Sequence, residues 1–90
     1  MSEGDLLIGG MTLRHLACEL KTEYHPEESR DWQLAGNLLL DSKHQQHLQI
    51  GRRYRLQLSD GRAGQVMISR LQADAAAHLI AEFEPTSVRK

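Results

Sequence analysis

Hydrophobic and polar residues alternate most regularly within residues 52–71, on both sides of the dipeptide Asp60-Gly61. Alternation of this kind predicts β-strands with one buried face, and Asp-Gly is typical of the turn in a β-hairpin. The sequence therefore predicts a hairpin here. Its inward-facing residues are Tyr54, Leu56, Leu58, Val66 and Ile68.

The alternation also restricts the turn of this hairpin. A two-residue turn would send the hydrophobic residues of the second strand to the opposite face from those of the first, because a shift of one residue reverses every side chain. A three-residue loop over 59–61, ending in a left-handed glycine that forms a bulge, keeps both sets on one face. This loop pairs Tyr54 with Val66 and Leu56 with Gly64.

Residues 11–24 fit two patterns. As a helix, the segment would begin at Thr12 and bury the hydrophobic residues that recur at helical spacing. As a strand, it would bury Leu16, Cys18 and Leu20 and expose the alternating charged residues of the opposite face, Glu19, Lys21 and Glu23. Because strands that follow one another in sequence usually pair, the β-rich surroundings favour the strand.

Each of the remaining segments fits one kind of structure. Residues 25–31 are polar and contain a proline, and they are expected to form a loop. Residues 32–40 and 77–84 alternate and are expected to be strands, and Gly36 within the first of them indicates a bulge or bend. Residues 41–51 are expected to form a short helix.

Together these elements predict a mainly β fold, a small five-stranded, partly open antiparallel barrel of the SH3-like or OB-like kind. One short helix lies between strands 2 and 3, whereas an OB-fold has its helix between the third and fourth strands. The barrel would occupy residues 11–85 as a single domain. Residues 1–10 are expected to be a flexible N-terminal segment, and residues 86–90 a frayed C-terminal tail.

Composition narrows the class of protein. The 90 residues carry a net charge of −1, which argues against a general binder of polyanions. A single cysteine indicates a reducing compartment, and we expect a cytoplasmic protein. The N-terminal residues lack the features of a signal peptide, and no apolar stretch is long enough for a membrane helix, so no membrane association is expected.

Histidine and cysteine residues supply one set of candidate metal ligands. His15 and Cys18 are three residues apart, as are His44 and His47, and four such ligands could hold zinc. This spacing matches no zinc-binding motif. In a strand, His15 and Cys18 would also point to opposite faces. We therefore expect no metal and no cofactor.

Arginine residues supply a second candidate site. Arg53 and Arg55 alternate with core residues and share the outer face of one strand, and Arg62 follows the turn. Clustered cations of this kind bind nucleic-acid phosphates. The outer positions of the hairpin carry no aromatic residue on which bases could stack. Nucleic-acid binding is therefore the alternative hypothesis.

Three hydrophobic residues face outward on the predicted strands: Leu39, Met67 and Ile80. If their strands are neighbours, these side chains form one apolar patch, and such patches mark protein contacts. The sequence carries none of the common catalytic motifs. We expect a small non-enzymatic protein-interaction module, which associates with itself as a homodimer or docks on a protein partner.

Overall fold

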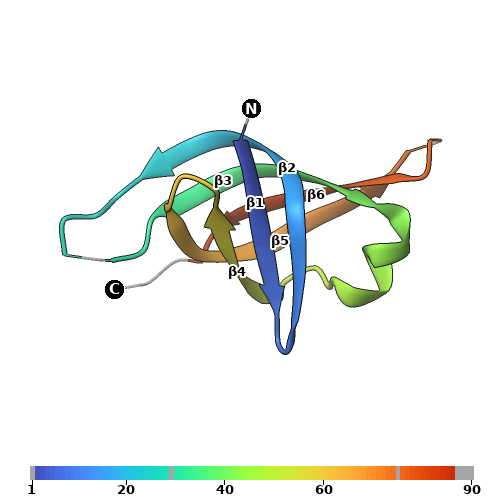
Figure 1. Ribbon diagram of the computed structural model, residues 1–90, viewed down its shortest axis with the longest axis horizontal. Coiled ribbons are helices and arrows are strands. Elements are labelled where there is room, and N and C mark those ends of the chain that lie inside the picture. Colours follow the sequence, from blue (N-terminus) through green and yellow to red (C-terminus); the bar gives the residue numbers. More distant parts are fainter. Residues whose placement is uncertain (1, 29, 75, 87–90) are drawn as a thin grey trace.

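Strands dominate the computed structural model, which describes residues 2–28, 30–74 and 76–86 (Figure 1). Six strands and one short 3₁₀ helix follow each other along the chain. They are β1 (Ser2–Ile8), β2 (Met11–Tyr24), β3 (Gln33–Asp41), η1 (Ser42–His47), β4 (Arg53–Leu58), β5 (Ala63–Ala73) and β6 (His78–Pro85).

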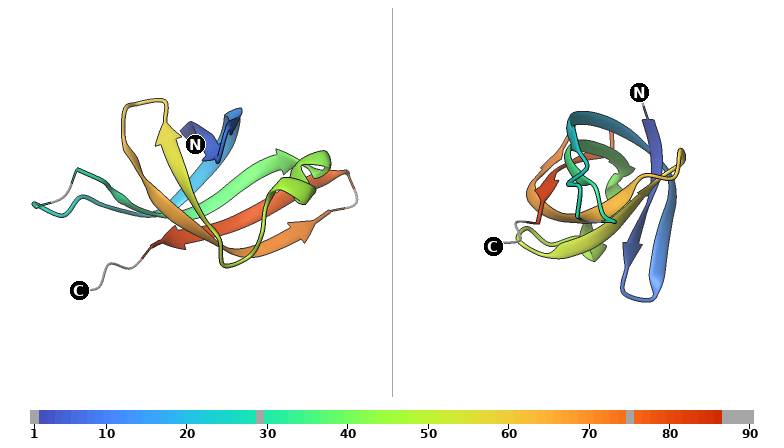
Figure 2. Two further views of the ribbon diagram at one scale, coloured as in Figure 1. Left: turned by 90° about the horizontal axis from the view of Figure 1, so that it is seen from below. Right: turned by 90° about the vertical axis from the view of Figure 1, so that its left-hand side faces the viewer.

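The strands form one closed antiparallel barrel in the order β1-β2-β3-β6-β5-β4, with β4 pairing back onto β1. The right-hand view of Figure 2 shows how the strands wrap into a ring. The predicted mainly β barrel is confirmed. It has six strands instead of five, and it is closed instead of partly open, because the N-terminal segment fills the gap between β2 and β4.

The prediction of a flexible segment over residues 1–10 is wrong for residues 2–8, which form β1. This strand pairs with β2 and β4, and its Leu6 is fully buried. Its short apolar run does not alternate clearly, so the sequence signal is weak and the two flanking strands determine its conformation. With β1 counted, the helical turn lies between the third and fourth strands, as in an OB-fold, which has five strands.

At the other end of the chain, Thr86 still contacts the barrel, where its backbone N–H donates to the carbonyl oxygen of Gln65 at 3.3 Å. The rest of the predicted frayed tail, residues 87–90, lies outside the described residues. No helix among the described residues is long and apolar enough to cross a membrane.

The strand prediction for residues 11–24 is confirmed, and a bulge explains why the sequence also fitted a helix. Leu13 pairs with Leu6 and Leu16 with Gly4, so β2 has one residue more than β1 between these pairs. The backbone at the bulge is left-handed at His15, with φ of 58°. The bulge places Leu13 and Leu16 three residues apart on the buried face, which is also a helical spacing.

The predicted hairpin is confirmed in detail. Tyr54 pairs with Val66 and Leu56 with Gly64. The N–H of Leu58 donates to the carbonyl oxygen of Arg62 at 2.7 Å, which leaves a three-residue loop. The last loop residue, Gly61, has φ of 98°, so the parity of the hydrophobic residues predicted both the register and the turn.

The predicted helix over residues 41–51 is shorter, since η1 covers only Ser42–His47. Asp41 caps it by accepting a hydrogen bond from the N–H of Lys43 at 3.2 Å. None of the η1 residues is buried, so no apolar face is present to extend the helix. Leu48, directly after η1, is buried and anchors the turn to the barrel.

Inside the barrel, one leucine-rich core is formed by residues from every strand and from Leu48. Its buried members are Leu6, Leu13, Leu16, Cys18, Leu34, Leu38, Leu40, Leu48, Tyr54, Leu56, Leu58, Val66, Ile68, Leu79, Ala81 and Phe83.

Two glycines allow the backbone to come close to other segments around this core. A Cβ atom on Gly36 would overlap the carbonyl oxygen of Glu19 in β2, and one on Gly64 would overlap the carbonyl oxygen of Trp32. Backbone cannot move aside as a flexible side chain can. The curvature of β3 and β5 at these points therefore depends on glycine.

Replacing Gly64 with alanine should lower the free energy of unfolding by about 3 kcal/mol, because the added methyl group overlaps backbone. Gly51→Ala is the matched control, since Gly51 has φ of 86° but nothing within 4 Å of its Cβ position. The control should lose only about 1 kcal/mol, the cost of a left-handed alanine. Urea unfolding measures both variants, and equal losses would contradict the role assigned to Gly64.

Candidate functional site

A short apolar row crosses the outer face of β2, β3 and β6. The strand register places Ala17 opposite Leu39, and Leu39 opposite Ile80. Leu39 is 43% exposed, and Ala17 and Ile80 are half-buried. We call these three residues the apolar row. The structure thus brings together two of the three predicted interaction residues.

Met67, the third predicted interaction residue, lies elsewhere. It pairs with Glu84 on β6 and Arg53 on β4. Ile80 is four residues from Glu84 along β6, a separation of about 13 Å. Ala17 takes the place of Met67 in the row. It could have been found from sequence, because it lies between the inward-facing Leu16 and Cys18.

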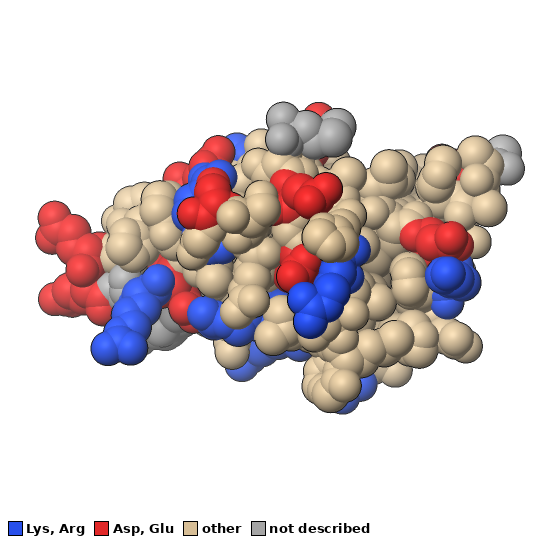
Figure 3. Space-filling model, in the orientation of Figure 1, with Lys and Arg blue, Asp and Glu red and all other residues tan. Residues whose placement is uncertain are grey.

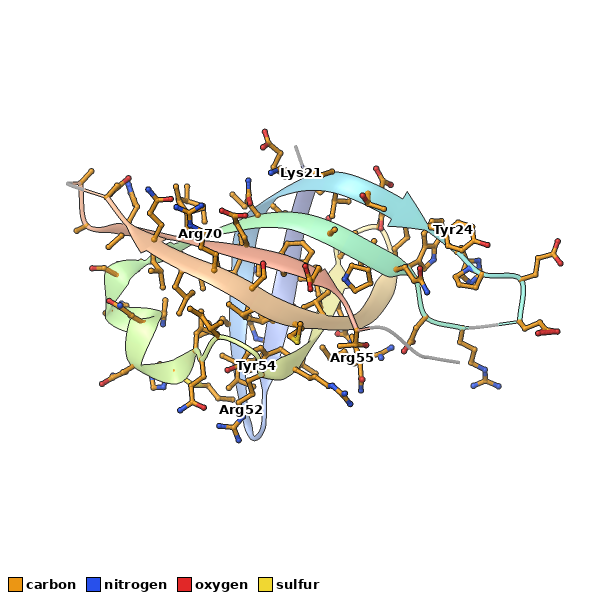
Figure 4. All side chains as sticks on the ribbon, turned by 180° about the vertical axis from the view of Figure 1, so that it is seen from behind. Lys21, Tyr24, Arg52, Tyr54, Arg55 and Arg70 are labelled. Atoms are coloured by element: carbon orange, nitrogen blue, oxygen red, sulfur yellow. The ribbon has the colours of Figure 1, made fainter. Side chains whose placement is uncertain are left out.

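A polar row runs beside the apolar one. It is formed by the next outward-facing residue along each strand. The register aligns Glu19 with Asn37, Asn37 with Glu82, and Glu82 with Arg70. We call these four residues the polar row. Nη1 of Arg70 lies 3.9 Å from Oε2 of Glu82, and both side chains are solvent-exposed. Figure 4 shows that Arg70 lies away from Tyr24 and Arg55, nearer the opposite end of the barrel.

A shallow hollow of about 180 Å³ lies between the two rows. Its lining residues are Ala17, Cys18, Glu19, Asn37, Leu38, Leu39 and Ile80. Asn37 is one of these lining residues, and its Oδ1 is shielded from solvent and has no hydrogen-bond partner among the described residues. An acceptor left without a donor costs about 1–3 kcal/mol, so a bound group that donates a hydrogen bond here would be stabilised.

Cys18 lies beneath this hollow, on the inner face of β2, and is a free, buried thiol. Burial raises the pKa of the thiol from 9.0 to about 11, and the positive charge of Arg62 offsets a smaller part of this rise. The thiol therefore stays protonated at neutral pH, whereas a nucleophilic or metal-binding cysteine must ionise.

The four predicted candidate metal ligands do not come together. His15 is exposed at the β2 bulge, where its Nδ1 lies 3.3 Å from Oε1 of Glu3, while Cys18 points into the core. The rings of His44 and His47 lie 6.3 Å apart on η1. The described part of the chain contains no group of three or more His, Cys, Asp or Glu residues that could hold a metal ion.

Carboxylates neutralise two of the three predicted nucleic-acid contacts. The Arg55 guanidinium donates two hydrogen bonds to Asp31, at 3.2 and 3.3 Å. Arg62 forms ion pairs with Glu23 and with Asp60. These contacts tie β2 and the loop after it to the β4–β5 hairpin. Sequence reasoning missed the pairs with Asp31 and Glu23 because these two partners are distant in the chain.

Arg53, the third predicted contact, is exposed on β4 and has no ion pair among the described residues. On the face seen in Figure 3, Lys and Arg side chains are interspersed with Asp and Glu, and acidic side chains gather over the loop between β2 and β3. A single cation in this mixed field is a poor match for a nucleic-acid backbone, which requires several.

Trp32 forms a second feature, at the end of the barrel beside that loop. The His25 ring stacks on Trp32 with centroids 4.8 Å apart, and the Arg62 guanidinium lies 5.5 Å from the Trp32 ring centre. The indole also packs against the core. A hollow of about 420 Å³ lies beside it, with Glu28, Asp31 and Trp32 in its lining. These contacts indicate that Trp32 closes this end of the barrel.

Comparisons with protein-family models, curated proteins and solved structures find no significant match to this chain. The function therefore has to be argued from the geometry of the chain itself.

The raised pKa of Cys18 predicts a loss of stability in alkaline solution. The unfolded thiol ionises near pH 9.0 and the folded thiol near 11, so unfolding releases a proton between these values. The contribution of the buried, protonated thiol to the free energy of unfolding is fully present below pH 9 and is lost as pH rises toward 11. Urea unfolding across this range should therefore show a steeper decline for the native chain than for Cys18→Ala, which controls for other groups. Parallel curves would contradict the raised pKa.

Proposed function

We propose that this chain is a small non-enzymatic protein-interaction module that binds protein through the apolar row. The observation that carries the proposal is the direct pairing of Leu39 with Ile80 on the outside of the barrel. Single exposed aliphatic residues are common on protein surfaces. Here two are adjacent, with Ala17 beside them and a hollow at their edge.

The closed barrel supports the use of side chains for docking. Each strand pairs with two neighbours over part of its length, which shortens the backbone edges that a partner's strand could use. We therefore propose that association uses side chains on an outer face. Asn37 lines the same hollow as Leu39, and its side-chain amide gives the apolar contact a polar group to orient it.

The reactive side chains favour binding over catalysis. The Cys18 thiol is buried and protonated at neutral pH, and the carboxylates of Glu23, Asp31 and Asp60 are engaged in ion pairs with arginines. A free buried thiol also fits the reducing cytoplasm that we propose as its location.

Photocrosslinking tests the proposed surface and captures whichever protein binds there. We would place p-benzoylphenylalanine at Gln72, which is exposed and pairs with Ile80 at the end of the apolar row. Irradiation of cells that express the full chain should give one discrete adduct. Leu39→Glu should abolish this adduct, because a charge in the contact must be desolvated.

Two controls separate a specific contact from random capture. The same photocrosslinker at Gln57, exposed on β4, should give no such adduct. Ile50→Glu changes an aliphatic residue that is 63% exposed but outside the row, and it should leave the Gln72 adduct intact. An adduct that survives Leu39→Glu, or no adduct at all from Gln72, would overturn the proposed function.

Nucleic-acid binding through Arg53, Arg55 and Arg62 remains the alternative proposal, and the ion pairs of the latter two weaken it. Fluorescence anisotropy with a labelled single-stranded oligonucleotide at low salt provides the test. We expect no saturable binding. Binding that weakens steeply with salt and is lost in Arg53→Ala would favour the alternative, since each phosphate contact releases counterions.

A further inference from the structure

We infer that the partner of the apolar row is a second copy of this chain, related by a two-fold axis parallel to the strands. The inference rests on the proposed function and names the partner of that same surface. It follows from the order of residues along each row. When a row is laid against a copy of itself that runs in the opposite direction, the aliphatic residues of the apolar row meet each other, and the acidic end of the polar row meets the basic end. The axis would lie above the surface, midway between β3 and β6.

Rotation about this axis reverses the strand order, so β2 of one copy faces β5 of the other and β3 faces β6. In the apolar row, Leu39 then meets Ile80 of the second copy. In the polar row, Glu19 meets Arg70 of the second copy. Each contact occurs twice because the interface is symmetric. The pairings follow from the register of the four strands alone.

The charges of the polar row suit this arrangement. In strand order, the row reads acidic, amide, acidic and basic, from Glu19 to Arg70. Reversal sets the basic end against the acidic end, and the amide against the second carboxylate. Arg70 is free to make this contact, since its side chain is 65% exposed and its link to Glu82 is long, at 3.9 Å. A net charge of −1 adds little repulsion between copies.

The curvature of the barrel agrees with the lengths of these side chains. Two convex surfaces approach most closely at the centre, where the shorter Leu39 and Ile80 side chains lie. The surfaces diverge toward β2 and β5, where Glu19 and Arg70 are long enough to span the gap. The aliphatic pair lies at the centre of the apolar row, and Glu19 and Arg70 lie at the flanks of the polar row with Asn37 and Glu82 between them. An apolar centre with charged residues at the rim matches the usual anatomy of an interface.

The orphan acceptor of Asn37 provides separate support. Arg70 of the second copy, when placed over Glu19, lies one strand away from Asn37, about 4.8 Å to the side. A guanidinium carries five N–H donors, so it can bind the Glu19 carboxylate and, after a rotation of the Asn37 side chain that brings its shielded oxygen to the surface, also donate to Oδ1 of Asn37. Among the described residues, no group within one copy supplies that donor.

Charge reversal tests the pairing. Glu19→Arg and Arg70→Glu each place like charges at both symmetric contacts, and each should weaken self-association about tenfold or more. An equimolar mixture of the two variants restores opposite charges at both contacts of a heterodimer, and should associate as the native chain does. Sedimentation velocity from about 10 µM to about 1 mM covers the weak affinities expected of a small interface.

Arg53→Glu is the matched control, because it makes the same charge change as Arg70→Glu on β4, away from both rows, and should leave association unchanged. Circular dichroism verifies that each variant folds. A native chain that stays monomeric up to about 1 mM, or a mixture no stronger than its components, would overturn the inference.

The photocrosslinking experiment at Gln72 distinguishes failure of the inferred self-association from failure of the proposed function. An adduct with twice the mass of the chain supports the second copy. An adduct with a different protein overturns the second copy as partner and leaves the docking surface in place. A monomeric chain without any adduct overturns both.

Discussion

The close approach of backbone segments at Gly36 and Gly64 is the constraint on which the barrel depends. A side chain at either position would overlap a carbonyl oxygen of the neighbouring segment. With glycine there, β3 can curve beneath β2 and β5 can pass beneath Trp32, so that a chain of 90 residues encloses one leucine-rich core. Closure gives each strand a neighbour on both sides for part of its length, which limits the strand edges open to other proteins.

The same constraint positions the candidate surface. Gly36 directly precedes Asn37, so the bend of β3 sets the outward direction of Asn37 and, two residues later, of Leu39. Because inward and outward residues alternate, the burial of Leu38 and Leu40 obliges Leu39 to face outward. A polar residue at position 39 would fit this geometry equally well. The presence of leucine there is our reason for proposing that the position binds protein.

The β4–β5 hairpin could be predicted from sequence to the level of its register, because each of its hydrophobic residues has a fixed parity and only one loop length reconciles the two strands. β1 could not be predicted in this way. Its Leu6 is buried by pairing with β2 and with β4, which is distant in the chain, and its own pattern is too short to show an alternation. The bulge at His15 made β2 hard to distinguish from a helix for a related reason, because it replaces a spacing of two residues between buried positions with a spacing of three.

The candidate site was predictable only in part. Parity identified Leu39 and Ile80 as outward-facing, but parity cannot give the position of a residue along a neighbouring strand, so Met67 was grouped with them wrongly. The partner of Arg55 lies on a loop whose course depends on tertiary contacts, and Glu23, which pairs with Arg62, is brought to it by the fold of β2. The polar row combines residues from four strands, and only the full register aligns them.

The central claim is that this chain associates with a second copy of itself through the outer face of β2, β3, β6 and β5. The most direct measurement is a dilution series followed by amide chemical shifts of the native chain in solution. Self-association at this face predicts concentration-dependent shifts centred on Leu39, Ile80 and Asn37, and constant shifts across β4. Shifts that do not change with concentration, or changes centred on Trp32 and the neighbouring loop, would contradict the account.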